Sequence, residues 1–155
     1  MENAPRTLPT LTLPNQDGSP IQIAETLGQF VVIYFYPKAM TSGCTEQACS
    51  IRDNKDVLSK LNVVTYGISP DKPATLAKFK QKEALNFDLL SDSEQILANQ
   101  FHSWVQKSMY GRTYMGLSRD IFIYTPQGEL LAAKRKISPK DHIKFVIDSI
   151  THSKS

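Results

Sequence analysis

The fold is decided by Phe30-Val-Val-Ile-Tyr-Phe-Tyr36, which runs directly into Pro37-Lys-Ala-Met-Thr-Ser-Gly-Cys44-Thr-Glu-Gln-Ala-Cys49. The first seven residues are all β-branched or aromatic and are apolar on both faces, which indicates a strand buried in the middle of a sheet. The proline ends this strand, because it cannot donate to a sheet ladder. We therefore expect a buried strand, a short glycine-containing loop and a helix that begins at or near Cys44.

Outside this stretch, strands alternate with helices. Polar and apolar residues alternate on either side of the turn Asn15-Gln16-Asp17-Gly18, which predicts an N-terminal β-hairpin. Further strands are expected at 63–68, 87–90, 120–124 and 129–133, and helices at 45–61, 73–82, 93–101 and from 138 onward. Residues 103–118 show no clear period and are expected to form a long loop. This order predicts an α/β fold with a mixed sheet, and the lack of a linker or repeat predicts one domain over residues 1–155.

Length and charge exclude several classes of protein. The chain of 155 residues has a formal net charge of only +3, so it offers no basic footprint for nucleic acid. No segment approaches the roughly 18 apolar residues of a membrane span, and the N-terminus lacks the features of a signal peptide. We therefore expect a cytoplasmic protein. In that reducing compartment a cysteine pair is more often catalytic, redox-active or metal-binding than a structural disulfide.

Cys44 is the first candidate for chemistry. The free N–H groups and the positive dipole end of the expected helix would stabilise its thiolate. Thr41 can place a hydroxyl beside the same pocket, and Pro37 can hold the loop in shape and shield one side of the sulfur. The alternative is that Cys44 is a small buried hydrophobic residue, as many free cysteines are.

The spacing of Cys44 and Cys49 restricts how the two sulfurs could react with each other. The pair is C-x-x-x-x-C, not the C-x-x-C of thioredoxin-like redox sites or zinc knuckles. Five residues on an ideal helix separate the Cα atoms by roughly 8 to 9 Å, whereas a disulfide requires less than about 7 Å. A disulfide between them would therefore require the first turns of the helix to unwind.

Metal binding is the competing use of two cysteines. His102, His142 and His152 are scattered, and none has ligand spacing to the cysteines or to another histidine. His142 and His152 fall on or after the last expected helix and are expected to be solvated. We expect no metal and no cofactor.

At this point the residues match a family. The motif Pro37-x-x-x-Thr41-x-x-Cys44 resembles the signature of the peroxiredoxins, thiol peroxidases on a thioredoxin-like fold. The extended motif through Cys49 is similar to the bacterioferritin comigratory protein branch, also called the Q type. Three further blocks match the family in order: residues 67–71 (Gly-Ile-Ser-Pro-Asp), 89–92 (Leu-Leu-Ser-Asp) and 116–119 (Gly-Leu-Ser-Arg). The resemblance implies a central mixed sheet flanked by helices, with an N-terminal β-hairpin.

The resemblance also implies a role for each site residue. Cys44 would be the peroxidatic cysteine, which attacks hydrogen peroxide or an organic hydroperoxide and becomes a sulfenic acid. Thr41 would hydrogen-bond the peroxide, and Arg119 would hold the thiolate and the developing oxyanion. Cys49 would resolve the sulfenic acid as an intramolecular disulfide, which thioredoxin or a similar thiol reductant would reduce. An internal resolving cysteine needs no second subunit, so a monomer, or at most a weak dimer, is expected.

Two departures from the family pattern are visible. Ser42 stands where a proline is usual, and Gln47 stands where many members carry glutamate. Two other functions remain open: a general thiol-disulfide oxidoreductase, against which the missing C-x-x-C counts, and a redox sensor or holdase that uses the disulfide as a switch.

Overall fold

A computed structural model describes residues 4–154, and the outermost residues of the expected 1–155 domain lie outside this range. The central sheet has five strands in the order β5-β4-β3-β8-β9. Their bounds are β3 (Phe30–Phe35), β4 (Val63–Ser69), β5 (Asp88–Ser91), β8 (Ile121–Tyr124) and β9 (Leu130–Lys134). β3 is parallel to β4 and antiparallel to β8, so the expected mixed sheet is confirmed.

β3 lies in the middle of the sheet, and all six of its residues are buried. Each neighbouring strand satisfies one edge of its backbone, and helices cover both of its faces. The helices are α1 (Ser42–Asp53), α2 (Lys55–Lys60), α3 (Pro73–Lys82), α4 (Ile96–Gln100) and α5 (His142–Ser153), with short 3-10 turns at Ile23–Glu25 and Pro139–Asp141.

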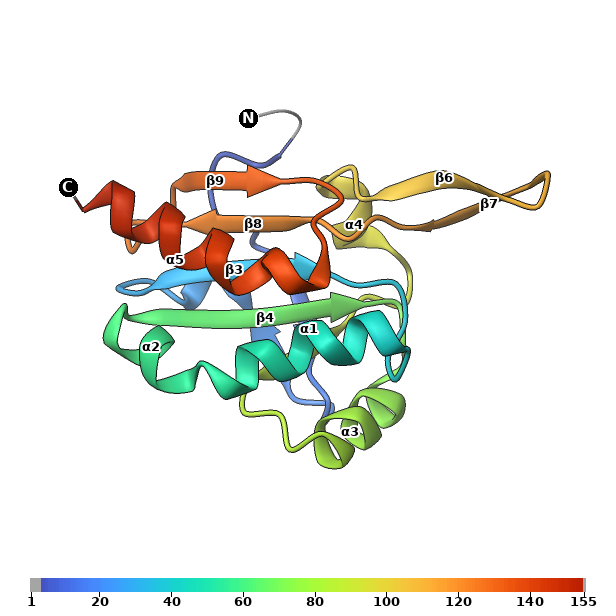
Figure 1. The fold of residues 1–155 in the computed structure, drawn as a ribbon, viewed down its shortest axis with the longest axis horizontal. Helices are drawn as coiled ribbons and strands as arrows, with labels where there is room; N and C mark the ends of the chain where they lie inside the picture. The colour runs from blue at the N-terminus through green and yellow to red at the C-terminus, as the bar shows by residue number, and fades with distance from the viewer. Residues whose placement is uncertain (1–3, 155) are drawn as a thin grey trace.

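Alternate residues of β3 enter two separate hydrophobic clusters. Val32 and Tyr34 pack with α1, α2, α3 and α5 on one face of the sheet. Val31, Ile33 and Phe35 pack with α4 and the N-terminal hairpin on the other face. Figure 1 shows α1, α2 and α5 lying together in front of the sheet. The period-2 geometry of a strand therefore produces the layered arrangement directly.

The N-terminal hairpin is confirmed as β1 (Thr12–Pro14) paired antiparallel with β2 (Pro20–Gln22). The long helix expected at 45–61 is instead two helices, and it begins earlier than expected, at Ser42. The break falls at Asn54, whose side chain donates to the backbone oxygen of Ser50 and competes with the helical pattern.

The expectation of a long loop at 103–118 is wrong. This segment is a hairpin of β6 (Trp104–Met109) and β7 (Arg112–Leu117), joined through Tyr110 and Gly111. Both joining residues have positive φ, 52° and 77°, as a type I′ turn requires. The hairpin projects from the body of the molecule (Figure 1), and most of its side chains are exposed. Because neither face is buried, the sequence shows no apolar alternation there.

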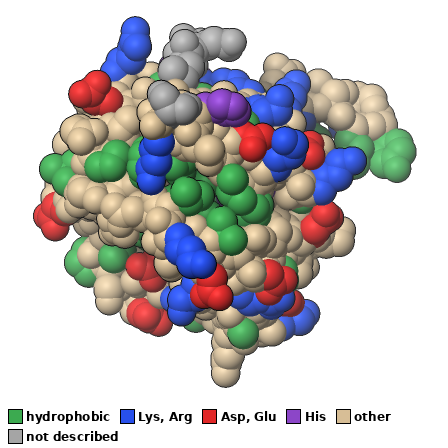
Figure 2. Space-filling view, turned by 60° about the vertical axis from the view of Figure 1, so that its left-hand side comes forward, with side chains coloured by type: hydrophobic (Ala, Val, Ile, Leu, Met, Phe, Trp, Pro, Cys, Tyr) green, Lys and Arg blue, Asp and Glu red, His purple; other side chains and the backbone are tan. Residues whose placement is uncertain are grey.

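The surface on the side of the molecule drawn in Figure 2 carries Lys and Arg side chains interspersed with Asp and Glu. This face therefore has no extended basic area. Within residues 4–154, no helix is both long enough and apolar enough to cross a membrane.

Candidate active site

The first turn of α1 places Cys44 at the centre of the site. Thr41 precedes the helix with extended backbone angles, and its carbonyl accepts the amide of Thr45 at 2.9 Å. Cys44 is the third residue of the helix and is only 2% exposed. The amides of the first turn have no partner within the helix, so this end of α1 carries partial positive charge. The expected position of Cys44 at a helix start is therefore found.

The loop between β3 and α1 is anchored by Asp71, from the loop that follows β4. Its Oδ2 accepts the amide of Ala39 at 2.8 Å and the hydroxyl of Ser69 at 2.9 Å. Met40 has a φ of 66°, which turns the chain into the helix. Pro37 is half-buried at the start of this loop. Asp71 thus supports the loop, a role that no pattern in the sequence predicted.

Thr41 does not hydrogen-bond the sulfur in this structure. Its hydroxyl donates to the backbone oxygen of Lys38 at 2.9 Å, and the side chain is exposed. Since its single proton is engaged, the hydroxyl oxygen remains free only to accept a hydrogen bond.

Arg119 brings a positive charge to the buried sulfur. Its Nη1 lies 3.5 Å from the sulfur of Cys44 and donates to Oε1 of Gln47 at 2.8 Å. The sequence alone would rank an arginine before a strand as a solvated charge, and only the family resemblance singled it out. The structure brings Arg119 and Cys44 together.

Gln47 connects Arg119 to His142. Its Oε1 accepts from Arg119, so its amide nitrogen donates to Nδ1 of His142, at 2.9 Å. His142 is therefore neutral with its proton on Nε2, and burial lowers its pKa to about 3. The expectation that His142 is solvated is wrong: it is 1% exposed and its ring packs edge-on against Tyr34. Its position opposite α1 depends on tertiary packing.

Asp120 fixes the chain on both sides of Arg119. Its fully buried carboxylate accepts hydrogen bonds from two hydroxyls, one guanidinium and one amide: Ser103 and Ser118 at 2.7 Å, Arg135 at 2.8 Å and the Lys136 amide at 3.0 Å. A buried carboxylate with this number of donors resists displacement. No local pattern predicted this network, because Asp120 appears in the sequence only as the first residue of an expected strand.

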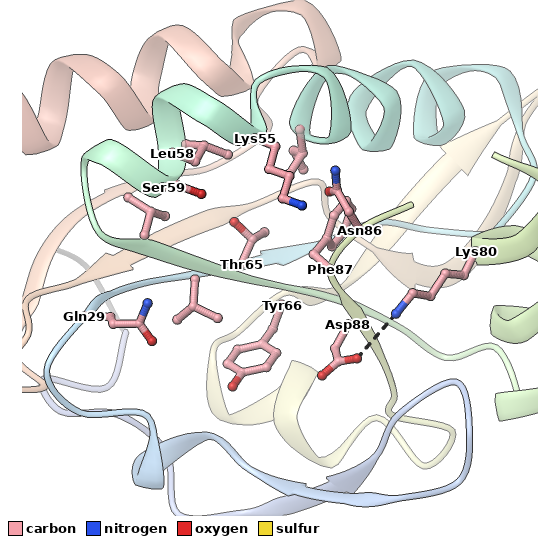
Figure 3. A pocket seen from close by; sticks show the side chains of 13 residues that line it. Gln29, Lys55, Leu58, Ser59, Thr65, Tyr66, Lys80, Asn86, Phe87 and Asp88 are labelled. Carbon is pink, nitrogen blue, oxygen red and sulfur yellow. Dashed lines mark ion pairs between the residues drawn. The ribbon is translucent and has the colours of Figure 1, made fainter. Parts of the chain in front are cut away.

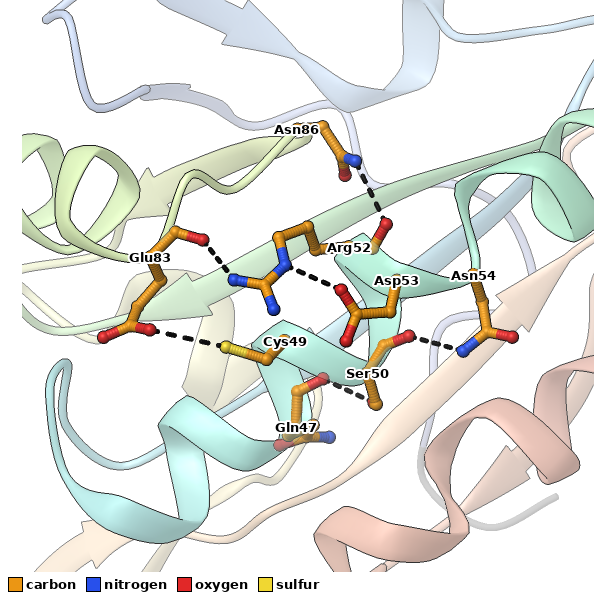
Figure 4. A network of polar contacts seen from close by, with 8 residues as sticks. All are labelled: Gln47, Cys49, Ser50, Arg52, Asp53, Asn54, Glu83 and Asn86. Atoms are coloured by element: carbon orange, nitrogen blue, oxygen red, sulfur yellow. Dashed lines mark hydrogen bonds and ion pairs between the residues drawn. The ribbon is translucent and has the colours of Figure 1, made fainter.

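The side chain of Cys49 points toward the end of α3. Its thiol is half-buried and donates to Oε1 of Glu83 at 3.5 Å (Figure 4). Burial and this carboxylate raise the pKa of Cys49. Both cysteines lie on the unbroken helix α1, and neither is in a disulfide.

A cavity of about 750 Å³ adjoins Arg119, between the β6–β7 hairpin and the segment after β9. Its lining combines apolar groups such as Val105 and Ile137 with basic groups such as Lys107. Burial and the charge of Arg119 lower the pKa of this lysine.

A second cavity, of about 350 Å³, lies between α2, β4 and β5 (Figure 3). It contains the ion pair of Lys80 with Asp88 at 3.6 Å and includes neither cysteine. Across residues 4–154, no group of three or more His, Cys, Asp or Glu side chains is arranged to hold a metal ion.

Comparison with known proteins shows the family of the chain. Residues 5–133 match the AhpC/TSA family. The chain is 45% identical over 140 residues to a putative peroxiredoxin bcp of Haemophilus influenzae, with 90% of each chain covered. It is 48% identical over 122 residues to peroxiredoxin Bcp of Escherichia coli K12, covering 79% of this chain and 78% of that one.

Among solved structures, the chain resembles the bacterioferritin comigratory protein of Xanthomonas campestris, studied as trapped intermediate and ligand complexes for its alkyl peroxide reduction activity. The TM-score is 0.89 at 28% identity, covering 98% of this chain and 99% of that one. The thioredoxin-like fold and these relatives identify the chain as a thiol peroxidase. The chain belongs to the AhpC/TSA family and, within it, to the Bcp or Q-type peroxiredoxins.

Proposed function

We propose that Cys44 is the peroxidatic cysteine of this peroxiredoxin. The observation that carries the proposal is the 3.5 Å contact between Nη1 of Arg119 and the sulfur of Cys44. A guanidinium stays charged and offers several donors, so it favours the thiolate and the oxyanion that develops as the peroxide bond breaks. The thiolate attacks one peroxide oxygen, the O–O bond breaks, and the leaving oxygen takes a proton to form water or an alcohol. Cys44 becomes a sulfenic acid.

Thr41 and Pro37 have supporting roles in this proposal. The Thr41 hydroxyl donates to the backbone oxygen of Lys38. Its oxygen can still accept a hydrogen bond from the O–H of a hydroperoxide at the start of α1. Pro37 starts the loop that Asp71 anchors, and the rigid ring limits the approach to Cys44 from that side.

Cys49 is the resolving cysteine of the proposed cycle. Its sulfur attacks the sulfur of the Cys44 sulfenic acid, the S–O bond breaks and water leaves, which yields an intramolecular disulfide. Because both residues lie on one helix, its first turns must unwind before the sulfurs meet. A thioredoxin-type dithiol then reduces the disulfide by thiol exchange.

The substrate range includes hydrogen peroxide and organic hydroperoxides. The cavity of about 750 Å³ beside Arg119 has room for more than a two-oxygen molecule, and its apolar lining suits an alkyl group. The alkyl peroxide reduction of the Xanthomonas campestris relative supports this range.

The proposal also covers the context in which the protein acts. Residues 1–155 act as one domain, since both hydrophobic clusters pack on one sheet. The cycle needs no second subunit, so the protein works as a monomer or at most a weak dimer, without nucleic acid or a membrane. The reducing cytoplasm suits a disulfide that is formed and broken in each turnover.

The test is steady-state peroxide consumption with a thioredoxin system present, using hydrogen peroxide and an alkyl hydroperoxide. The parent protein should turn over continuously with both peroxides, and Cys44→Ser should abolish turnover. A single stoichiometric oxidation of the parent without further turnover would contradict the peroxidase proposal and favour a redox sensor.

A further inference from the structure

The thiol of Cys49 contacts a carboxylate from another part of the chain. Glu83 follows α3, 34 residues after Cys49, and its Oε1 lies 3.5 Å from the cysteine sulfur. Figure 4 shows the Cys49 side chain directed at this carboxylate. Nothing in the peroxide reaction described above uses Glu83.

The position of Glu83 is fixed by contacts from the same helix that carries Cys49. Nη1 of Arg52 donates to the backbone oxygen of Glu83 at 2.6 Å, and Asn86 donates to the backbone oxygen of Arg52 at 3.2 Å. These bonds join the second half of α1 to the segment between α3 and β5 (Figure 4). The backbone of Glu83 is therefore held beside α1, within reach of Cys49.

The carboxylate of Glu83 favours the protonated form of the Cys49 thiol. An ionised carboxylate only accepts hydrogen bonds, so it can bind the protonated thiol of Cys49 but repels the thiolate. The thiolate is the form that attacks a sulfenic acid. The contact thus stabilises the unreactive form of Cys49 while α1 is intact, and it must break when the helix unwinds.

We propose that Glu83 is a positioning residue that holds Cys49 as a docked thiol and thereby prolongs the lifetime of the Cys44 sulfenic acid. The inference rests on the proposed function of Cys49 as the resolving cysteine. Unwinding of α1 moves Cys49 from the carboxylate into water, where its proton passes to solvent. Its sulfur then supplies the electron pair for the new S–S bond, and the hydroxide that leaves Cys44 takes up a proton.

This delay affects a competing reaction. A second peroxide molecule can oxidise the waiting sulfenic acid to a sulfinic acid, releasing water or an alcohol. The longer Cys49 stays docked, the larger the fraction of Cys44 that follows this route. Glu83 therefore sets the sensitivity of the enzyme to excess peroxide.

The first test follows Cys49 alone. In a Cys44→Ser background Cys49 is the one remaining thiol, because the chain has two cysteines. We expect Glu83→Gln in this background to raise the rate of alkylation by iodoacetamide about threefold or more at pH 7.5 and to shift its pH midpoint downward. The other charged groups that act on Cys49, Arg52 and Asp53, stay unchanged in this comparison.

The matched control is Glu94→Gln, which removes the same charge from an exposed loop before α4. It should leave the alkylation rate of Cys49 unchanged. Equal rates for Glu83→Gln, Glu94→Gln and the parent background would overturn the inference. This readout requires no peroxidase activity, so it remains decisive if the proposed function fails.

The second test uses the two-cysteine protein. After one equivalent of peroxide, Glu83→Gln should form the disulfide at least about twofold faster than the parent, because the thiol is less firmly docked. Its sulfinic fraction, measured by mass spectrometry at excess peroxide, should be smaller. Slower disulfide formation would instead make Glu83 a base for the resolving step and would overturn the inference. If Cys49→Ser still recycles with thioredoxin, the resolving role itself is wrong, whatever the alkylation rates show.

Discussion

The guanidinium of Arg119 lies 3.5 Å from the sulfur of Cys44, although the two residues are 75 positions apart in the chain. The same nitrogen also donates to Gln47, one turn along the helix from the cysteine. Gln47 is neutral, so it orients the guanidinium without competing for its charge as a glutamate would. The glutamine at this position thus leaves the positive charge of Arg119 unneutralised beside the sulfur of Cys44.

Replacing Arg119 should therefore slow the reaction with peroxide. We expect Arg119→Gln to lower the second-order rate constant for Cys44 oxidation about a hundredfold, since it removes the charge-assisted donor at the reacting atoms. Stopped-flow measurement of Cys44 oxidation gives this constant. Arg119→Lys keeps the charge, so its rate constant should lie between that of the parent and that of Arg119→Gln. An unchanged rate constant for the glutamine variant would remove Arg119 from the catalytic group.

The two steps of the cycle should separate in Cys49→Ser. The first oxidation of Cys44 should keep its rate, because Cys49 faces α3 rather than the reacting sulfur. Recycling by thioredoxin should be lost, and the protein should accumulate sulfenic and then sulfinic acid, visible by mass spectrometry. Normal steady-state turnover of this variant with thioredoxin would show that Cys49 is not the resolver.

Disulfide formation should change the backbone of α1. Five helical residues place the two Cα atoms roughly 8 to 9 Å apart, beyond the reach of a disulfide of about 7 Å. We expect a crystal structure of the oxidised protein to show the first turns of α1 unwound, with Cys44 no longer buried. An oxidised structure with the S–S bond and an intact helix from Ser42 to Asp53 would contradict this prediction.

Asp120 should be important for stability as well as for the position of Arg119. Asp120→Asn replaces a fully buried carboxylate that accepts four hydrogen bonds by a neutral amide that cannot accept them all, and we expect a loss of about 3 kcal/mol in the free energy of unfolding. Urea denaturation measures this loss. Asp56→Asn, at an exposed position of α2, is the matched control and should cost less than about 0.5 kcal/mol. Equal stability of the two variants would show that the Asp120 network is unimportant.

His142 should make the fold sensitive to mild acid. Its pKa is about 3 in the folded protein, against about 6.5 for an unperturbed histidine. Between these values the unfolded chain binds a proton that the folded chain does not. The contribution of His142 to the free energy of unfolding is therefore fully present above pH 6.5 and decreases as the pH falls below it. From pH 7 to pH 5 this group should contribute a loss of roughly 2 kcal/mol.

The variant His142→Gln tests this pH dependence, because glutamine offers an acceptor to Gln47 and does not titrate. Its free energy of unfolding should fall less between pH 7 and pH 5 than that of the parent. His152→Gln removes an exposed histidine and should follow the parent. If His142→Gln loses as much stability as the parent over this range, burial of His142 does not determine the acid sensitivity.

Local sequence patterns determined the framework of this protein. The apolar run of β3 indicated a buried strand because a strand covered on both faces shows no polar alternation, and the residues after it predicted the loop and the helix start that carry Cys44. The spacing of Cys44 and Cys49 predicted their separation on one helix, since helix geometry is fixed by residue number. The family motifs singled out Thr41 and Arg119.

Only the tertiary structure decided which distant groups surround the two cysteines. His142 lies opposite Gln47 because α5 packs on α1, and Glu83 meets Cys49 because α3 ends beside the same helix. Asp120 is fixed by four donors from three places along the chain, and the β6–β7 hairpin has no buried face to leave a pattern in the sequence. Contacts between segments distant in the chain depend on how helices and sheet pack, and no local periodicity records that packing.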